Sequence, residues 1–208
     1  MIAEIEKNIR SRKETDKLMW FSIWVLLSVA SFGLAWFLMI YFLIKRRNTH
    51  FSRQKELETL ILTRLNRINK QKNLNHESSF DIKNDKKVIF RNTWTWALST
   101  ILIFPAFYII YFLTVDLQRH EENEFGFLMK VNSMLQNLDL EINLDEITVR
   151  KKFELNRYLF FSIMTIGFAA IYWLYRIFND YNIHFKRQWK LEDELLKFLT
   201  SLNCSEAN

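Results

Sequence analysis

A phrase of chemically versatile side chains occurs twice in the sequence. Residues 45–62 read KRRNTHFSRQKELETLIL and residues 179–196 read NDYNIHFKRQWKLEDELL, so N-x-H-F-x-R-Q-x-x-L-E recurs. Within each copy a histidine, a glutamine and a glutamate follow one another at every fourth position, which places them along one face of a helix. Imidazole, amide and carboxylate groups on one face can share hydrogen bonds, bind a partner or coordinate a metal ion. The candidate residues are His50, Arg53, Gln54 and Glu58 in the first copy and His184, Arg187, Gln188 and Glu192 in the second.

Three interpretations of this polar face remain open. The preferred one is a hydrogen-bond network that ties each polar helix to its neighbour or to a partner. Metal binding by His50 and His184 with a carboxylate is a weaker alternative, because no pair has tight ligand spacing and glutamine is a poor ligand. Contact with lipid headgroups is the third, and a basic run supports it; that run is Lys45, Arg46 and Arg47. The sequence therefore predicts an interaction site, and we assign no metal and no cofactor to it.

The repeat extends well beyond this phrase. A shift of 134 residues aligns Gly33 with Gly167 and His50 with His184. A shift of 70 residues gives a fainter third copy, in which His120 takes the place of His50 and the rest of the phrase is lost. Similarity at a fixed period indicates a repeated supersecondary unit. Each unit reads as an apolar segment followed by an amphipathic polar one.

The apolar segments are long and uncharged. Residues 18–44, 92–115 and 158–175 contain no Asp, Glu, Lys or Arg. Uncharged apolar stretches of about 18 or more residues are typical of membrane helices, and tryptophan and tyrosine near their ends suit the headgroup level. We therefore expect an all-α membrane protein with three apolar membrane helices, each followed by an amphipathic polar helix, in three repeats of which the middle one is degenerate.

The predicted boundaries follow the repeats. The domain ranges are 1–70 for repeat 1, 71–87 for a flexible linker rich in Asn, Lys and Ser, 88–140 for repeat 2 and 141–208 for repeat 3. The membrane helices are expected at about 18–44, 92–115 and 155–178, and the polar helices at about 48–70, 117–138 and 180–202.

Helix-breaking residues lie inside the apolar segments. Gly33, Pro105 and Gly167 occupy similar places in the three units, where glycine or proline indicates a kink or close helix packing. Residues 165–176 read TIGFAAIYWLYR, which resembles T-x-G-I-Y-x-x-Y-W-x-Y-K, the motif of a family of small multi-pass membrane proteins of unknown function with repeated membrane segments. The matching residues are Thr165, Gly167, Tyr172, Trp173, Tyr175 and Arg176. The resemblance implies a membrane location and no particular activity.

The charges flanking the segments predict a topology. If all three segments span, residues 45–91 and 176–208 share one side and carry 18 Lys and Arg, against 11 on the other. The excess of positive charge predicts a cytoplasmic C-terminus of a multi-pass protein in the cell membrane. The alternative is re-entrant: a break at the glycine leaves arms of about 12 residues, roughly 18 Å long, which do not cross ~30 Å of hydrocarbon. We expect the spanning arrangement.

The sequence indicates no catalytic chemistry. It contains no G-x-x-x-x-G-K-[ST], H-E-x-x-H, C-x-x-C or G-x-S-x-G motif. The net charge of +6 does not predict nucleic-acid binding, because the basic residues cluster beside the membrane segments and no nucleic-acid-binding motif occurs. We therefore predict a non-enzymatic integral membrane protein, a scaffold, adaptor or accessory subunit that associates with itself or with a membrane protein partner. The alternative is a subunit of an oligomeric channel or transporter.

Overall fold

A computed structural model describes residues 1–71, 89–136 and 154–206. All regular elements in these ranges are α-helices, which confirms the all-α prediction. The chain begins with α1 (Ile2–Arg10) and α2 (Arg12–Thr15). Three units follow, each with a short and a long helix: α3 (Phe21–Ala30) and α4 (Leu34–Gln71), α5 (Thr93–Ser99) and α6 (Ile103–Gln136), α7 (Leu155–Met164) and α8 (Phe168–Glu206). Residues 72–87 of the predicted linker lie outside the described residues, as do 137–153.

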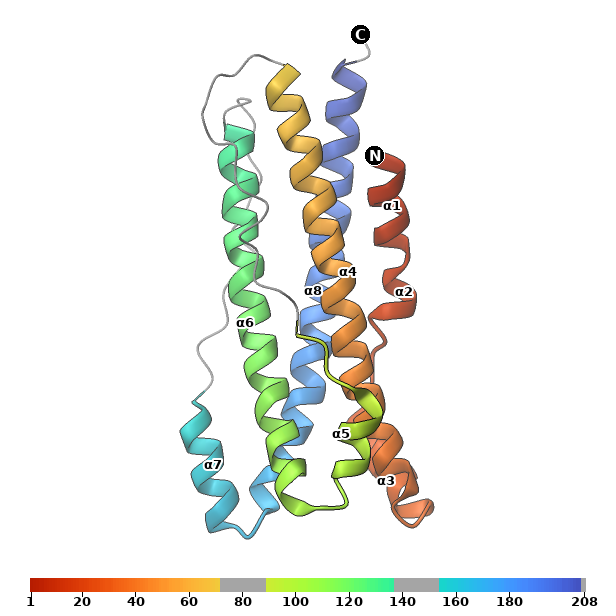
Figure 1. Ribbon diagram of the computed structural model, residues 1–208, viewed down its shortest axis with the longest axis vertical. Coiled ribbons are helices and arrows are strands. Elements are labelled where there is room, and N and C mark those ends of the chain that lie inside the picture. Colours follow the sequence, from red (N-terminus) through yellow and green to blue (C-terminus); the bar gives the residue numbers. More distant parts are fainter. Residues whose placement is uncertain (72–88, 137–153, 207–208) are drawn as a thin grey trace.

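The long helices form a bundle in which all three run in the same direction. Figure 1 shows α4, α6 and α8 side by side along the long axis of the molecule. Each short helix folds back beside the first turns of the long helix that follows it, so three helical hairpins turn at the same end. Helix α1 packs against α4 and α8, and both chain termini lie toward the end opposite the hairpin turns (Figure 1).

Each predicted membrane helix is interrupted near its middle, which corrects the expected continuous helices at 18–44, 92–115 and 155–178. The first unit breaks at Phe32 and Gly33, with φ of 52° and 91°, and the third breaks at Ile166 and Gly167, with φ of 50° and 92°. Left-handed residues end an α-helix, and glycine adopts this conformation without a steric penalty. The second half of each apolar segment instead continues without interruption into the polar helix. In the described ranges, no helix is both long enough and apolar enough to cross a membrane.

The two glycines serve the turn rather than close helix packing. A Cβ added at Gly33 would meet no atom within 4 Å, and one at Gly167 would meet only Phe107 Cζ at 3.9 Å. The positive φ, not a close contact, is therefore what requires glycine at these positions. Pro105 lies in the first turn of α6, where its missing N–H has no intrahelical partner to lose.

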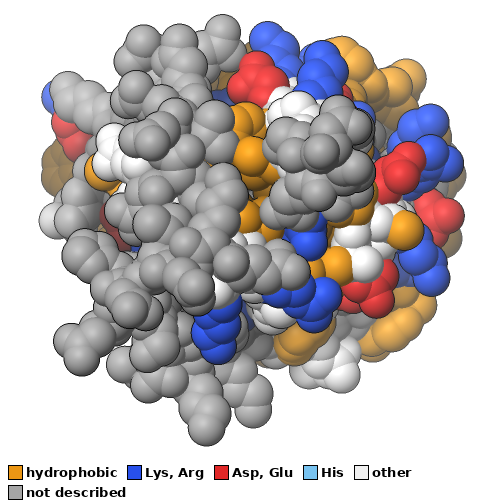
Figure 2. All heavy atoms as spheres, turned by 90° about the horizontal axis from the view of Figure 1, so that it is seen from above, with side chains coloured by type: hydrophobic (Ala, Val, Ile, Leu, Met, Phe, Trp, Pro, Cys, Tyr) orange, Lys and Arg blue, Asp and Glu red, His pale blue; other side chains and the backbone are white. Residues whose placement is uncertain are grey.

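Two hydrophobic cores stabilise the bundle. The first lies near the hairpins and contains aromatic side chains such as Phe112, Trp173 and Phe178. The second lies farther along the bundle, where the predicted amphipathic stripes of the polar helices meet. Its members include Leu57, Ile61, Leu65, Val131, Met134, Leu195 and Leu199, together with Ile5 and Ile9 of α1. Viewed along the bundle from the end opposite the turns, basic and acidic side chains are scattered among hydrophobic ones over the described surface (Figure 2).

Candidate functional site: a buried three-histidine cluster

One histidine from each unit lies between the two cores. His50 of α4, His120 of α6 and His184 of α8 form a nearly equilateral triangle, because their ring centroids are 5.2, 5.1 and 5.1 Å apart. The Nε2 atoms of His50 and His184 are 3.1 Å apart. The sequence repeat therefore places equivalent residues at one point in space. The spanning arrangement expected from the sequence placed His120 on the other side of the membrane from the other two, whereas the structure brings all three together.

A buried carboxylate orients the first histidine. Asp16, which precedes α3, lies 2.9 Å from His50 Nδ1 through its Oδ1 atom. Arg53 Nη2 and Trp189 Nε1 donate hydrogen bonds to the other carboxylate oxygen, at 2.8 and 3.0 Å. Burial alone raises the pKa of Asp16, but the hydrogen bond from His50 and the charge of Arg53 outweigh it and hold that pKa well below its usual range. Asp16 is therefore an anion inside the protein.

Two acidic side chains lie beside His184. Glu121 Oε1 lies 3.3 Å from His184 Nδ1, and Glu124 Oε2 lies 3.9 Å from the same atom. Arg187 Nη2 donates to Glu121 at 3.1 Å and also lies 3.4 Å from His184 Nδ1. Burial raises the pKa of Glu124 to about 8, against the opposing charge of Arg187. The middle unit, in which the phrase is lost, thus supplies the acidic partners of His184 and Arg187 in the third unit.

The three imidazoles are neutral at pH 7. Burial lowers the pKa of His50 and of His120, and it lowers the pKa of His184 to about 4 although Glu121 opposes the shift. Neutral imidazole keeps a lone pair on one ring nitrogen, so it can accept a hydrogen bond or ligate a metal.

The other residues of the repeated phrase divide into two groups. Arg53 also donates to Glu192 Oε1 at 2.8 Å, which joins the predicted residues of α4 and α8 in one buried network. Gln54 and Gln188 are buried one turn beyond the histidines. Gln54 Oε1 and both amide atoms of Gln188 have no hydrogen-bond partner in the described parts of the chain. Glu58 is half-buried on the same side of α4.

The predicted lipid-contacting run is mostly engaged by the protein itself. Arg47 pairs with Asp116 at 2.9 Å, and Arg46 donates to Asn182 at 3.1 Å; both arginines are buried. Lys45 alone of the three is exposed. The burial of Arg46 and Arg47 means that these guanidinium groups hold α4 to its neighbours rather than face headgroups.

No family model, curated protein or solved structure matches this chain. The resemblance to small membrane proteins with repeated segments therefore stays a prediction, and the geometry of the histidine cluster and of the hairpins carries the functional interpretation.

Sequence reasoning missed Asp16 and did not use Glu121 and Glu124. Asp16 has no counterpart in the repeat, since Arg150 lies at the equivalent position of the third unit. The available signal was its place, because Asp16 is the last acidic residue before the first uncharged segment. For Glu121 and Glu124 the signal was their spacing from His120 on one helix.

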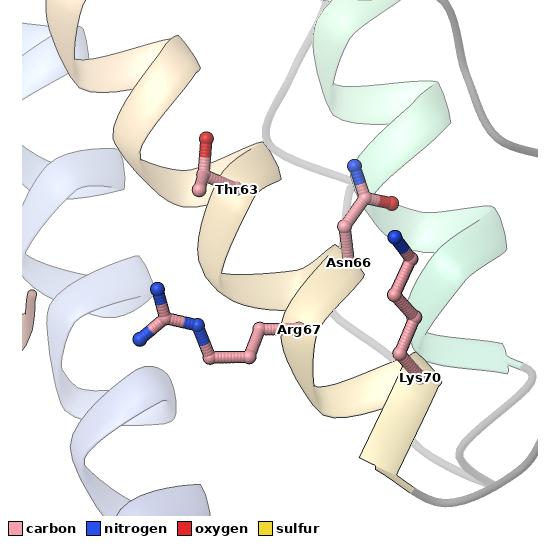
Figure 3. Close-up of a pocket in the computed structure, with 4 residues that line it drawn as sticks. All are labelled: Thr63, Asn66, Arg67 and Lys70. Atoms are coloured by element: carbon pink, nitrogen blue, oxygen red, sulfur yellow. The ribbon is translucent and has the colours of Figure 1, made fainter.

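A hollow on α4 is not a comparable site. Its lining is Thr63, Asn66, Arg67 and Lys70, all from one helix. Figure 3 shows Arg67 extending to one side of α4 and Asn66 and Lys70 to the other. These side chains do not converge on a common point, so they do not define a ligand.

Proposed function

We propose that this protein is anchored in one leaflet of a membrane by its three hairpins and that the bundle beyond them serves as a non-catalytic scaffold or adaptor. The observation that carries the proposal is the exposure of large apolar side chains at all three turns. Phe32, Phe104 and Ile166 are 99%, 88% and 94% exposed. Contiguous apolar surface of this kind marks an interaction site, and its chemistry suits hydrocarbon.

The backbone at the turns supports burial in lipid, where unpaired polar groups are costly. Gly33 N donates to Ser28 O at 2.7 Å, and Gly167 N donates to Ser162 O at 2.8 Å. The hydroxyls of Ser31 and Thr165 accept from Ala35 N and Ala169 N, at 2.8 and 2.9 Å. The first and third turns therefore satisfy, from within, N–H groups that their helix ends would otherwise leave free.

The size of the hairpins matches one leaflet. Helices α3 and α7 each contain 10 residues, which gives roughly 15 Å at 1.5 Å per residue. The hydrocarbon core of a bilayer is ~30 Å thick, so an arm of this length reaches the midplane and returns. All three hairpins point the same way (Figure 1), which allows them to enter together.

Basic side chains lie at the open ends of the first and third hairpins. Lys17 and Lys45 flank the first, Arg157 and Arg176 flank the third, and all four are exposed. Lysine and arginine near an anionic surface contribute about 1 kcal/mol each. Beyond this level the surface carries both signs of charge (Figure 2), as expected of a region that faces water or a protein partner.

Charges introduced at the turns should abolish anchoring. We expect the triple variant Phe32→Asp, Phe104→Asp and Ile166→Asp to be released from membranes by alkaline carbonate, whereas the wild-type chain stays in the pellet, because a carboxylate in hydrocarbon is strongly unfavourable. The matched control carries Thr59→Asp, Ser133→Asp and Thr200→Asp, three exposed positions on the long helices, and should stay in the pellet. Retention of the turn variant, with helicity unchanged by circular dichroism, would show that the turns do not lie in lipid.

One-leaflet anchoring also predicts that all three polar helices share one side. In a Cys204→Ser background, we expect Ser52→Cys on α4 and Asn123→Cys on α6, both exposed, to react alike with an impermeant maleimide. With a cytoplasmic bundle, both are protected in intact cells and both react in inverted vesicles. Reaction at position 123 alone in intact cells would restore the spanning arrangement and contradict the proposal.

A further inference from the structure

The contacts of the ring nitrogens of His50 and His184 decide where the protons of these two side chains can lie. Each Nδ1 atom of His50 and His184 faces a carboxylate oxygen, at 2.9 and 3.3 Å. A carboxylate only accepts hydrogen bonds, so the contact with Asp16 places a proton on His50 Nδ1. His184 Nδ1 faces both the acceptor Glu121 Oε1 and, at 3.4 Å, the donor Arg187 Nη2. The Nε2 atoms of His50 and His184 are 3.1 Å apart. With the proton of His184 on Nδ1, as Glu121 favours, their lone pairs point toward each other and repel unless a cation lies between them.

The third ring strengthens the same conclusion. His120 Nε2 is buried and has no hydrogen-bond partner among the described residues. A buried polar atom without a partner costs free energy, and its persistence calls for a ligand, a water molecule or an ion. One ring nitrogen from each histidine lies within 4.8 Å of the other two. Three imidazoles therefore gather one ring nitrogen each around one point.

We propose that His50, His120 and His184 bind one divalent transition-metal ion of the zinc class, with Asp16 and Glu121 orienting two of the rings. Imidazole nitrogen suits Zn²⁺ and its first-row neighbours, whereas Ca²⁺ and Mg²⁺ prefer oxygen. A histidine ligand almost always donates its other ring N–H to a carboxylate, carbonyl or water, as the Nδ1 atoms of His50 and His184 are placed to do. This assignment replaces the sequence-based expectation of no metal.

The distances are compatible with coordination. Metal–nitrogen bonds of about 2.0–2.1 Å in a tetrahedral site separate the ligand nitrogens by roughly 3.3 Å. The observed 3.1 Å between His50 and His184 is close to this value, and the third nitrogen needs a ring shift of about 1–1.5 Å, within reach of a change in side-chain torsion. Three protein ligands leave the fourth position for water or an exogenous ligand.

The metal proposal stands independently of membrane anchoring. It rests on the contacts of the long helices, whereas anchoring rests on the hairpin turns. A loss of metal binding would leave the carbonate result unchanged, and failure of anchoring would leave the metal titration unchanged.

The test is direct titration of the purified full chain in detergent, after chelator treatment, with Co²⁺ and then Zn²⁺. We expect one Co²⁺ per chain, the visible absorption of a four-coordinate nitrogen site, and displacement by Zn²⁺. His120→Leu removes one ligand and should weaken binding by roughly 100-fold or more. His76→Ala, which changes the remaining histidine and lies outside the described residues, is the matched control and should bind as the wild-type chain does.

A second variant probes the orienting carboxylate without removing a ligand. Glu121→Gln should weaken binding roughly 10- to 100-fold, because outer carboxylates position the ligating ring. Absence of saturable Co²⁺ binding by the wild-type chain overturns the proposal, and so does binding that His120→Leu leaves unchanged. In the first case His184 carries its proton on Nε2 and donates it to His50, with Arg187 donating to Nδ1, so that the cluster is a structural hydrogen-bond network.

Discussion

Arg53→Met is expected to lower the free energy of unfolding by about 3–5 kcal/mol, the range for removing one member of a buried ion pair. Arg53 Nη2 lies 2.8 Å from both Asp16 and Glu192, and all three side chains are buried. Methionine keeps most of the aliphatic volume but leaves two carboxylates inside the protein without their common cation. The loss of charge compensation, rather than a cavity, therefore dominates the effect.

Equilibrium unfolding in detergent, followed by circular dichroism, measures this change. Arg67→Met is the matched control, because Arg67 lies on the same helix and is exposed; surface substitutions of this kind change stability by about 0.5 kcal/mol or less. Equal stability of the Arg53 and Arg67 variants would mean that Asp16 and Glu192 are not held as an anionic pair by Arg53.

Trp173→Ala should also cost about 3–5 kcal/mol, as large-to-small changes at buried aromatic positions do. Trp173 is 1% exposed in the core beside the hairpins, and its Nε1 donates to Thr114 Oγ1 of α6 at 3.0 Å. Trp173→Phe separates the two contributions. It keeps most of the ring packing and removes the hydrogen bond, which is worth about 1 kcal/mol.

The same unfolding measurement applies, with Trp20→Ala as the control of identical chemistry. Trp20 is 60% exposed, so its truncation creates no cavity and should change stability little. A similar loss in the Trp20 and Trp173 variants would indicate that the packing of α8 against α6 does not limit stability.

Much of the fold was accessible from the sequence because it depends on periodicity. The amphipathic polar helices predicted from the sequence meet in the second core, where Leu57, Ile61 and Leu65 lie. The shift of 134 residues predicted that the chain would take the same path twice. The nearly equal φ values at Gly33 and Gly167, 91° and 92°, confirm this equivalence at the level of single residues. A hydrophobic pattern and a repeat length can both be read directly from the sequence, so the features that depend on them are predictable.

The sequence did not predict that the chain reverses its direction within an apolar segment. Hydropathy is identical for a straight helix and for two antiparallel arms, and one glycine is compatible with a kink, a close contact or a turn. The reversal depends on Phe32 and Ile166, non-glycine residues that adopt positive φ just before each glycine. Because this conformation is uncommon for bulky side chains, the sequence pattern favoured the wrong alternative.

The site was partly predictable. The repeat identified His50 and His184 and suggested that they face each other, but partners outside the phrase leave no periodic trace. Asp16 comes from the segment before the first hairpin, and Glu121 and Glu124 come from positions where the repeat has lost its pattern. Where one unit supplies the acid that pairs with an arginine of another unit, the two units differ in sequence at that point. A search for repeats therefore does not reveal such a pair.

The two repeated arginines are neutralised in different ways. Arg53 pairs with Asp16, from the segment that precedes the first unit, and with Glu192, from the third unit. Arg187 pairs with Glu121, from the middle unit. Each arginine therefore depends on an acid that another part of the chain supplies. The units are complementary rather than interchangeable, and a chain with its units in another order would separate these charges.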